Sequence, residues 1–311
     1  MSLAFVFPGQ GSQAVGMQAE LAAVYPQIEA SYQEASDVLG FDLWKLTQEG
    51  PTEALGQTIN TQPAMLVAGV AVWRAWHSAG GPAPTMLSGH SLGEYTALVC
   101  AGAMSFVDGI RLVRRRGELM QNAVPAGEGA MAAVLGLDDD AIMEVCAEAS
   151  MIGVAEPVNF NSPGQVVVAG HQTALMLLVG LAKDAGARRA IMLPVSVPSH
   201  SSLMRPAGEA LIELLDTIEF KMPETTVIST VDATPYDDAA DIGRHLSQQV
   251  YSPVRWVNAV QKLIENGATH LVECGPGKVL TGLNKRIDRS VPGVCIDSPA
   301  ALVKSIEEAK Q

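Results

Sequence analysis

The sequence predicts an α/β protein in which a parallel sheet is covered by helices on both faces and carries a smaller inserted unit. Short apolar runs alternate with helical patterns before residue 103 and again after residue 224, which favours a parallel sheet. Between about residues 127 and 197 the order changes to strand, helix, strand, strand, helix, strand, as in a ferredoxin-like βαββαβ unit. We therefore expect a main domain of residues 1–126 and 198–311 and an inserted subdomain of residues 127–197.

The elements of the main domain follow from apolar periodicity and from glycine and proline stops. The run LAFVF ends at Pro8-Gly9, which is typical of a buried strand leading into a loop. A long apolar helix is expected further on, with Pro63 in its first turn. The expected elements are, in order, a strand over 3–7, helices over 28–40 and 60–81, a strand over 85–90, a helix over 91–102, a strand over 225–230, a helix over 254–267, a strand over 269–275 and a helix over 278–287.

The inserted subdomain is predicted by the same criteria. Its first helix has three aspartates in its first turn, which suits the positive end of a helix dipole. A short SPG turn joins its two middle strands. The expected elements are a strand over 130–136, a helix over 138–150, strands over 153–161 and 164–170, a helix over 173–186 and a strand over 188–197.

Composition excludes several classes of protein. A formal charge of −13 is opposite to that of a general nucleic-acid binder. The apolar stretches fall short of the ~20 residues of a membrane span, and the N-terminus has no basic segment of a signal peptide. The four cysteines lie far apart, without a C-x-x-C pair, so neither a zinc site nor a disulfide framework is indicated. We expect a cytoplasmic protein without a membrane or nucleic-acid partner.

Residues 89–93, GHSLG, match the G-x-S-x-G pattern of a nucleophile elbow and stand between a predicted strand and a predicted helix. Glycines suit the sharp turn, and Ser91 is placed at the head of a helix, where free N–H groups can stabilise an oxyanion. The alternative is that Ser91 only caps the helix, with Glu94 completing a capping box. The strand and helix around the motif favour the nucleophile.

A serine nucleophile needs a base, and the chain has six histidines. His200 is the best candidate because it lies in a loop after the last strand of the insert, where the chain returns to the main sheet. No aspartate between Ser91 and His200 is well placed to orient the base, which weakens a lipase or esterase interpretation. The other candidates, each with a more ordinary structural explanation, are His77, His90, His171, His245 and His270.

The whole chain resembles one family, the malonyl-CoA:acyl carrier protein transacylases, which are related to the acyltransferase domains of polyketide and animal fatty acid synthases. The resemblance rests on motifs in family order: FVFPGQGSQ, GHSLGEYTALVCAG, RRRGELMQNAVP, NFNSPGQVVVAG, PVSVPSHSSLM, QQVYSPVRW and VECGPGKVLTGL. It implies an α/β-hydrolase-like core with the inserted ferredoxin-like subdomain. It also implies a ping-pong reaction through an acyl-serine.

The resemblance assigns roles by position. Ser91 is similar to the nucleophile and His200 to its base. Gln249 matches the residue whose main-chain carbonyl orients that base, which accounts for the missing acid; from the residues alone, a helix-end glutamine facing solvent is the simpler interpretation. Gln10 and Leu92 match the residues whose N–H groups form the oxyanion hole.

Arg116 resembles the arginine that binds the malonyl carboxylate, a role suited to the planar guanidinium fork. Gln62 is expected to line the same pocket. For Arg114 and Arg115 a solvated helix face is the better interpretation.

The implied substrates are malonyl-CoA and holo acyl carrier protein, with no cofactor or metal, in fatty acid biosynthesis. Two basic clusters are candidates for binding an acidic carrier protein, although ordinary surface charge explains them equally well. The first contains Lys278, Lys285, Arg286 and Arg289, and the second contains Arg188 and Arg189. Two rival functions use the same residues: a serine hydrolase or thioesterase that passes the acyl group to water, and a catalytically silent module that binds the carrier.

Overall fold

The computed structural model describes residues 2–195 and 197–310, so the predictions for residues 1, 196 and 311 lie outside the described part. The larger of its two sheets has five strands in the order β7-β2-β1-β8-β9, and every neighbouring pair is parallel. Its strands are β1 (Leu3–Phe7), β2 (Met86–Gly89), β7 (Thr226–Ile228), β8 (His270–Glu273) and β9 (Gly293–Cys295).

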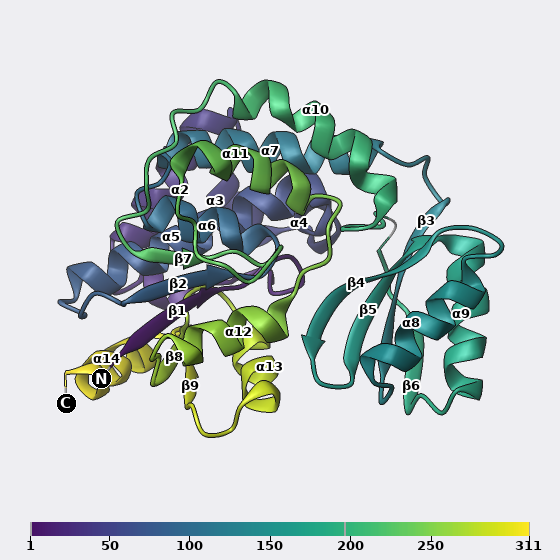
Figure 1. Cartoon of the computed structure of the whole chain (residues 1–311). Helices are drawn as coiled ribbons and strands as arrows, with labels where there is room; N and C mark the ends of the chain where they lie inside the picture. Colours follow the sequence, from purple (N-terminus) through teal and green to yellow (C-terminus); the bar gives the residue numbers. More distant parts are fainter. Residues whose placement is uncertain (1, 196, 311) are drawn as a thin grey trace.

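The central strand β1 is buried on both faces. Leu3, Phe5 and Phe7 join the large apolar core formed with the helices of one face. Ala4 and Val6 join a second core on the opposite face, as expected when successive side chains of a strand alternate. Figure 1 shows α5 and α6 on one side of this sheet and α12 and α13 on the other. The predicted parallel sheet with helices on both faces is confirmed.

The helices of the main body are α1 (Ala19–Ala22), α2 (Gln27–Leu39), α3 (Leu43–Glu49), α4 (Thr52–Gly56), α5 (Thr58–Ser78), α6 (Leu92–Cys100), α7 (Phe106–Asn122), α10 (Arg205–Leu215), α11 (Ala239–Gln249), α12 (Trp256–Glu265), α13 (Val279–Ile287) and α14 (Pro299–Ala309), with a short 3-10 turn at Ser202–Met204. Several have defined N-caps, such as Ser105, whose hydroxyl accepts from the backbone N–H of Asp108 at the start of α7.

The second sheet is antiparallel and has the order β4-β5-β3-β6, which is the ferredoxin-like arrangement. Its elements are β3 (Gly129–Leu135), α8 (Asp139–Ala149), β4 (Ala155–Ser162), β5 (Gln165–His171), α9 (Gln172–Asp184) and β6 (Arg189–Met192). The helices α8 and α9 cover one face and share a core with it (Figure 1). The other face, with Met131, Val158 and Val167, is turned away from these helices.

Strand β4 connects the small sheet to the main body. The N–H of Phe160 donates to the carbonyl of Val254 at 3.0 Å, and the N–H of Val254 donates to the carbonyl of Val158 at 2.8 Å. This pair of bonds joins β4 to the segment just before α12. The small sheet is therefore held beside the carboxyl ends of the main strands.

Two predicted details differ from the structure, and several elements had no prediction. Helix α5 begins at Thr58, so Pro63 lies in its second turn; the carbonyl of Ile59, which proline cannot serve, accepts from Arg114 Nη1 at 3.2 Å. Strand β6 ends at Met192, before Pro194, which has no N–H for pairing. The elements α1, α3, α4, β9, α10 and α14 had no prediction, and α7 and α11 were expected to be helical without predicted bounds.

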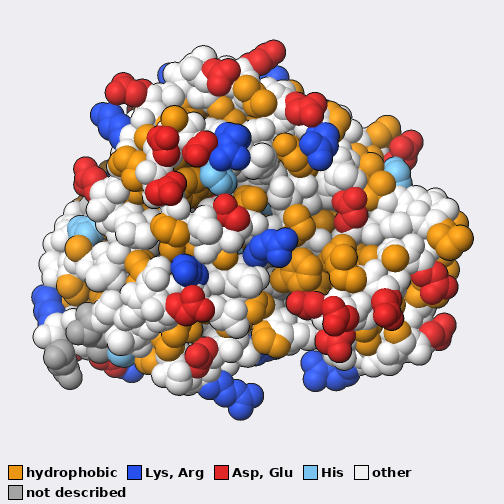
Figure 2. All heavy atoms as spheres, in the orientation of Figure 1, with side chains coloured by type: hydrophobic (Ala, Val, Ile, Leu, Met, Phe, Trp, Pro, Cys, Tyr) orange, Lys and Arg blue, Asp and Glu red, His pale blue; other side chains and the backbone are white. Residues whose placement is uncertain are grey.

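On the face shown in Figure 2, acidic and basic side chains are interspersed. In the described ranges 2–195 and 197–310, no helix has the length and hydropathy needed to cross a membrane. The part of the chain that the structure describes also holds no cluster of three His, Cys, Asp or Glu side chains placed to bind a metal.

Candidate active site

Ser91 lies in a sharp turn between β2 and α6, with φ 52° and ψ −110°, a conformation that L residues seldom adopt. The two flanking glycines make the turn possible. A Cβ on Gly89 would lie 1.9 Å from the carbonyl carbon of Gly93, and a Cβ on Gly93 would lie 2.0 Å from the carbonyl oxygen of Phe7. The chain thus packs too closely for a side chain at position 89 or 93, and Ser91 is held at the tip of a turn with the geometry of a nucleophile elbow.

The hydroxyl of Ser91 faces a histidine instead of capping its helix. Ser91 Oγ lies 2.7 Å from His200 Nε2, and His200 Nδ1 lies 2.8 Å from the main-chain carbonyl oxygen of Gln249. With a carbonyl acceptor at Nδ1, that nitrogen carries the proton and Nε2 is free to accept from the serine. The capping-box alternative does not hold, because Glu94 bonds to Thr230, Tyr236 and Gln249.

His200 is fixed by its own backbone as well as by its ring. Its φ is 68°, and its N–H donates to the carbonyl of Val250 at 3.1 Å. The side chain is almost fully buried. Burial, and after it the nearby positive charge of Arg116, lower the pKa of His200 to about 3, against the smaller opposite effect of its hydrogen bond to Gln249. The imidazole is therefore neutral at physiological pH and able to accept a proton.

Arg116, on α7, brings a buried positive charge close to Ser91. Its Nη1 donates to Gln62 Oε1 at 2.9 Å, and its Nη2 lies 3.2 Å from Gln249 Oε1 and 3.3 Å from Ser91 Oγ. The guanidinium lies over the ring of Tyr95 at 5.2 Å, and its buried Nε has no partner among the described residues. No ion pair within residues 2–195 and 197–310 includes Arg116. The positive charge of Arg116 is therefore available to an anion that enters the site.

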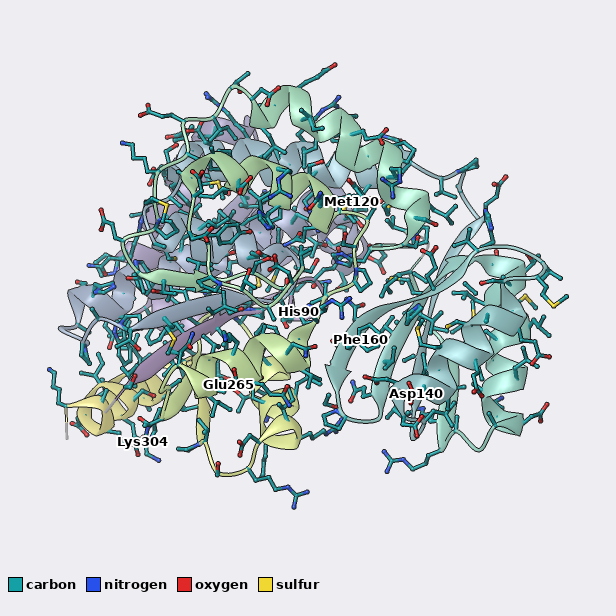
Figure 3. All side chains as sticks on the ribbon, viewed as in Figure 1. His90, Met120, Asp140, Phe160, Glu265 and Lys304 are labelled. Atoms are coloured by element: carbon teal, nitrogen blue, oxygen red, sulfur yellow. The ribbon has the colours of Figure 1, made fainter. Side chains whose placement is uncertain are left out.

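A cavity of about 720 Å³ opens at these residues. The bare face of the small sheet contributes Met131 and Val167 to its wall, and α13 contributes Leu280 and Leu283. In Figure 3, the labelled His90 and Met120, which also line it, lie on the side of the main body that faces the small sheet. Ser91 therefore lies between the two sheets, in a cavity with polar groups at its base and apolar walls.

The structure brings most of the predicted site residues together. Gln10 and Leu92 line the cavity beside Ser91. Leu92 is the first residue of α6, so its N–H precedes the intrahelical hydrogen bonds. Gln62, which we expected at the pocket wall, instead lies behind Arg116 and outside the cavity lining among the described residues; its side chain orients the guanidinium. Gln249 also lies outside the cavity lining among the described residues; its main-chain carbonyl contacts His200 and its side-chain amide contacts Arg116.

Sequence reasoning missed a link between the elbow and the small sheet. His90 Nε2 lies 2.8 Å from Asn161 Oδ1, and its ring packs against Trp256 with centroids 5.6 Å apart. Burial lowers the pKa of His90, against the weaker effect of the Asn161 bond. Asn161 falls within the motif NFNSPG, so its polar side chain beside a turn was the available signal.

Comparison with known proteins agrees with this geometry. The family described as "Acyl transferase domain" matches residues 4–301. The malonyl CoA-acyl carrier protein transacylase of Salmonella typhimurium is 52% identical over 305 residues, covering 98% of this chain and 99% of the relative.

Solved structures give the same result. A crystal structure of an acyl carrier protein S-malonyltransferase from Vibrio cholerae superposes with a TM-score of 0.96 at 52% identity, covering 98% of this chain and 100% of that one. A chain from a complex of a type II PKS acyl-carrier protein with its malonyl-transacylase gives 0.98 at 49% identity, covering 99% and 100%. The chain therefore belongs to the acyl transferase family, as one of its malonyl-CoA:acyl carrier protein transacylases.

Proposed function

We propose that this protein transfers the malonyl group of malonyl-CoA to the phosphopantetheine thiol of acyl carrier protein through a malonyl ester on Ser91. One observation carries the proposal: the Ser91 hydroxyl lies between a neutral base, His200, at 2.7 Å and the guanidinium of Arg116 at 3.3 Å. An acyl chain ending in a carboxylate can use both groups. The names of the relatives, and the complex of one neighbour with an acyl-carrier protein, support the same reaction.

In the first half-reaction His200 Nε2 accepts the hydroxyl proton as Ser91 Oγ attacks the thioester carbonyl. The imidazolium that forms is stabilised through Nδ1–H, which donates to the carbonyl of Gln249. We assign the oxyanion to the N–H groups of Gln10 and Leu92, each such donor being worth about 3 kcal/mol. When the C–S bond breaks, His200 returns its proton to the departing CoA thiolate.

The second half-reaction reverses these steps with a new thiol. His200 accepts the proton of the phosphopantetheine thiol, the sulfur attacks the ester carbonyl, and the Ser91–acyl bond breaks as Ser91 regains a proton. No oxidation state changes and each proton is handled by His200. The proposed reaction accordingly needs no redox cofactor or metal.

Arg116 is proposed to select the malonyl group. Its fork can donate two hydrogen bonds to one carboxylate in a water-poor site, where such a pair is strong. An acetyl group leaves the buried guanidinium without an anion, which costs several kcal/mol relative to a paired one. Gln62 and Gln249 hold the guanidinium from behind with neutral oxygens.

For the carrier protein we propose docking at a cluster of basic residues on α13 and at its two ends. This helix lines the cavity mouth through Val279 and Leu283, so a partner bound here can direct its prosthetic arm inward. Arg286 also bonds to the side chain of Gln165, another lining residue. The cluster consists of the exposed residues Lys278, Lys285, Arg286 and Arg289. The pair Arg188 and Arg189 is a weaker candidate because it lies at the start of β6, whereas the cavity is lined by Leu193 and Pro194, which follow the other end of that strand.

We also propose that the protein acts in the cytoplasm. Its four cysteines are free, as is typical of proteins kept in a reducing compartment.

The decisive experiment is intact-protein mass spectrometry after brief mixing with malonyl-CoA or acetyl-CoA, with Ser91→Ala alongside. The proposal predicts a single malonyl adduct that the variant lacks and that holo acyl carrier protein discharges. Free malonate without an adduct and without carrier protein would instead indicate a hydrolase. Neither adduct nor malonate would indicate a catalytically silent carrier-binding module.

A further inference from the structure

A second buried charge lies close to the nucleophile, and the mechanism above does not use it. Glu94, on α6, is fully buried. Its Oε1 accepts from the hydroxyl of Tyr236 at 2.6 Å. Its Oε2 accepts from the hydroxyl and the N–H of Thr230 at 2.8 and 3.3 Å and from Gln249 Nε2 at 2.7 Å. No lysine, arginine or histidine in the described residues forms an ion pair with it.

The side-chain amide of Gln249 lies between this carboxylate and Arg116. Its Nε2 donates to Glu94 Oε2 and, at 3.0 Å, to the carbonyl of Ser91, while its Oε1 accepts from Arg116 Nη2. A carboxylate can only accept hydrogen bonds and a guanidinium can only donate them. The amide is therefore restricted to one orientation, with its NH₂ toward Glu94 and its oxygen toward Arg116.

The buried charges of Arg116 and Glu94 are opposite in sign, but the two side chains form no direct ion pair because the Gln249 amide lies between them. A direct ion pair would satisfy the guanidinium and compete with a substrate carboxylate. With one amide between them, Arg116 is held beside Ser91 by a neutral oxygen and keeps its charge for an incoming anion. The same contact anchors Gln249, whose carbonyl oxygen orients His200.

We propose that Glu94 is a positioning residue for malonyl selection, acting by holding the Gln249 amide so that its oxygen keeps Arg116 at the nucleophile. The inference rests on the proposed function, because it takes Arg116 as the partner of the malonyl carboxylate. Glu94 itself touches neither Ser91 Oγ nor the cavity. Its loss should therefore change the preference among acyl groups more than the chemistry of transfer.

Two conservative substitutions separate position from charge. Glu94→Asp keeps the negative charge but shortens the side chain by one methylene, which withdraws the carboxylate from Gln249. Glu94→Gln removes the charge but keeps the reach: its oxygen can take the place of Oε2, and its NH₂ can donate to the oxygen of Tyr236, which is able to accept. If Glu94 acts by holding Gln249 in position, Glu94→Asp loses this function and Glu94→Gln keeps it.

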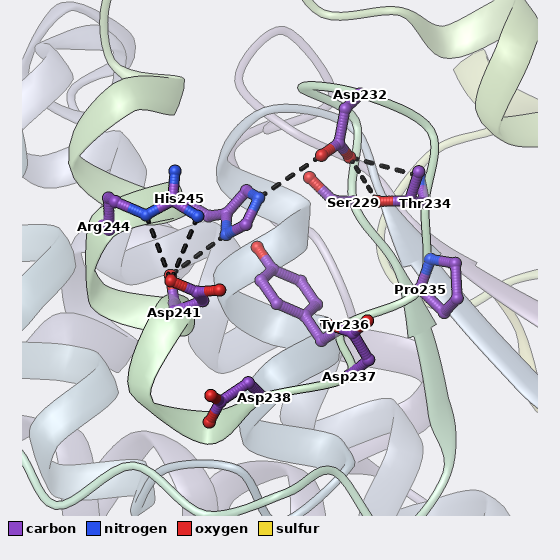
Figure 4. A pocket seen from close by; sticks show the side chains of 10 residues that line it. All are labelled: Ser229, Asp232, Thr234, Pro235, Tyr236, Asp237, Asp238, Asp241, Arg244 and His245. Carbon is purple, nitrogen blue, oxygen red and sulfur yellow. Dashed lines mark hydrogen bonds and ion pairs between the residues drawn. The ribbon is translucent and has the colours of Figure 1, made fainter.

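Tyr236 offers an independent route to the same contact. It forms part of the wall of a second cavity, of about 330 Å³, where its ring packs against His245 with centroids 5.4 Å apart (Figure 4). Tyr236→Phe removes the hydrogen bond that holds Oε1 and lets the carboxylate rotate away from Gln249. Ser247→Ala is the matched control, because it removes a buried hydrogen bond from the same helix as Gln249, to the carbonyl of Gly208 at 2.9 Å.

The measurement is the ratio of kcat/KM for Ser91 acylation by malonyl-CoA and by acetyl-CoA, with thermal unfolding of each variant. Loss of a hydrogen bond to a charged group predicts that Glu94→Asp lowers the malonyl-to-acetyl ratio at least about tenfold, chiefly through a higher KM for malonyl-CoA. Tyr236→Phe is expected to lower the ratio about threefold, and Glu94→Gln to keep it within about twofold of wild type. Ser247→Ala should lower the melting temperature and leave the ratio unchanged.

Several outcomes would overturn the inference. An unchanged ratio in Glu94→Asp, or equal losses toward both thioesters, would reduce Glu94 to a structural residue. If Glu94→Gln lowered the malonyl-to-acetyl ratio as much as Glu94→Asp, the negative charge of Glu94, and not its position, would determine the selectivity. If Glu94→Asp does not fold, an unchanged ratio in Tyr236→Phe would likewise reduce Glu94 to a structural residue. Failure of the proposed function is distinguishable, because the wild-type protein would then form no malonyl adduct on Ser91.

Discussion

The Nη2 atom of Arg116 lies 3.3 Å from the Oγ atom of Ser91, so a buried cation adjoins the proposed nucleophile. In the described residues this guanidinium meets amide oxygens, a hydroxyl and an aromatic ring, but no carboxylate. Burying a charge without an opposite partner is costly. A carboxylate that arrives with the substrate, as proposed above for Arg116, would account for this arrangement.

Arg116→Ala should therefore lower kcat/KM for malonyl-CoA by about a hundredfold or more, the usual effect of removing one partner of a buried charged pair. Acetyl-CoA use should rise relative to malonyl-CoA. Arg115→Ala is the matched control, since Arg115 is exposed and bonds to Glu118 at 3.4 Å. Unchanged selectivity in Arg116→Ala would remove Arg116 from this role.

The acylation rate should be nearly independent of pH on the acidic side. Only neutral His200 accepts a proton, and its pKa is lowered from 6.5 to about 3, so the base stays active as the pH falls through 6. We expect kcat/KM for malonyl-CoA to stay flat between about pH 5 and 8. An acidic limb centred near pH 6.5 would contradict this.

The same shift makes stability depend on pH. Between pH 6.5 and about 3, His200 is protonated in the unfolded chain and neutral in the folded one. The unfolded state then binds more protons, so the free energy of unfolding falls as the pH is lowered through this window. Urea unfolding at a series of pH values measures this slope, which His200→Ala should reduce.

Gly93→Ala should destabilise the protein, because its Cβ would lie 2.0 Å from the carbonyl oxygen of Phe7. We expect a loss of at least about 2 kcal/mol in the free energy of unfolding, as for overpacking in a rigid core. Gly180→Ala is the control: it lies within α9 and its Cβ would meet nothing within 4 Å, so it should gain about 0.5–1 kcal/mol. Chemical denaturation of both variants tests the pair, and equal stabilities would contradict the close packing at the elbow.

Charge reversal of Lys285, Arg286 and Arg289 should raise KM for acyl carrier protein, with a weaker dependence on salt. Self-acylation by malonyl-CoA should be unaffected. The same change at Arg188 and Arg189 serves as the comparison. If only the second change weakens carrier binding, the docking surface lies at β6 and not at α13.

Much of the fold could be predicted because local patterns and tertiary packing agree. The strand over 3–7 is found at Leu3–Phe7, where proline and glycine end the apolar run. The inserted unit follows its predicted order because each helix has its own apolar face and stop. Local patterns do not predict an element boundary that involves a contact distant in sequence. Helix α5 begins before the predicted residue, and the carbonyl of Ile59 that Pro63 leaves free accepts from Arg114.

The site shows the same limit. The glycines around Ser91 mark the elbow because only they fit it, and the position of His200 after a strand indicated a base. By contrast, Glu94 looked like part of a capping box, since spacing alone cannot show that its carboxylate turns inward to Thr230 and Gln249. Gln62 was predicted to line the cavity wall because the sequence does not show how far a side chain lies from the cavity surface.

The distance along the chain between the site residues has a consequence for biosynthesis. Ser91 and His200 are 109 residues apart, and Arg116 and Gln249 are 133 apart. Contacts between such distant segments require closure of long loops and form late in folding. Until the ribosome has made residues 200 and 249, the chain lacks both His200 and the Gln249 carbonyl that contacts its ring. We therefore expect reactivity of Ser91 toward cellular thioesters to require a chain in which at least residues 91 to 249 have been made and folded together.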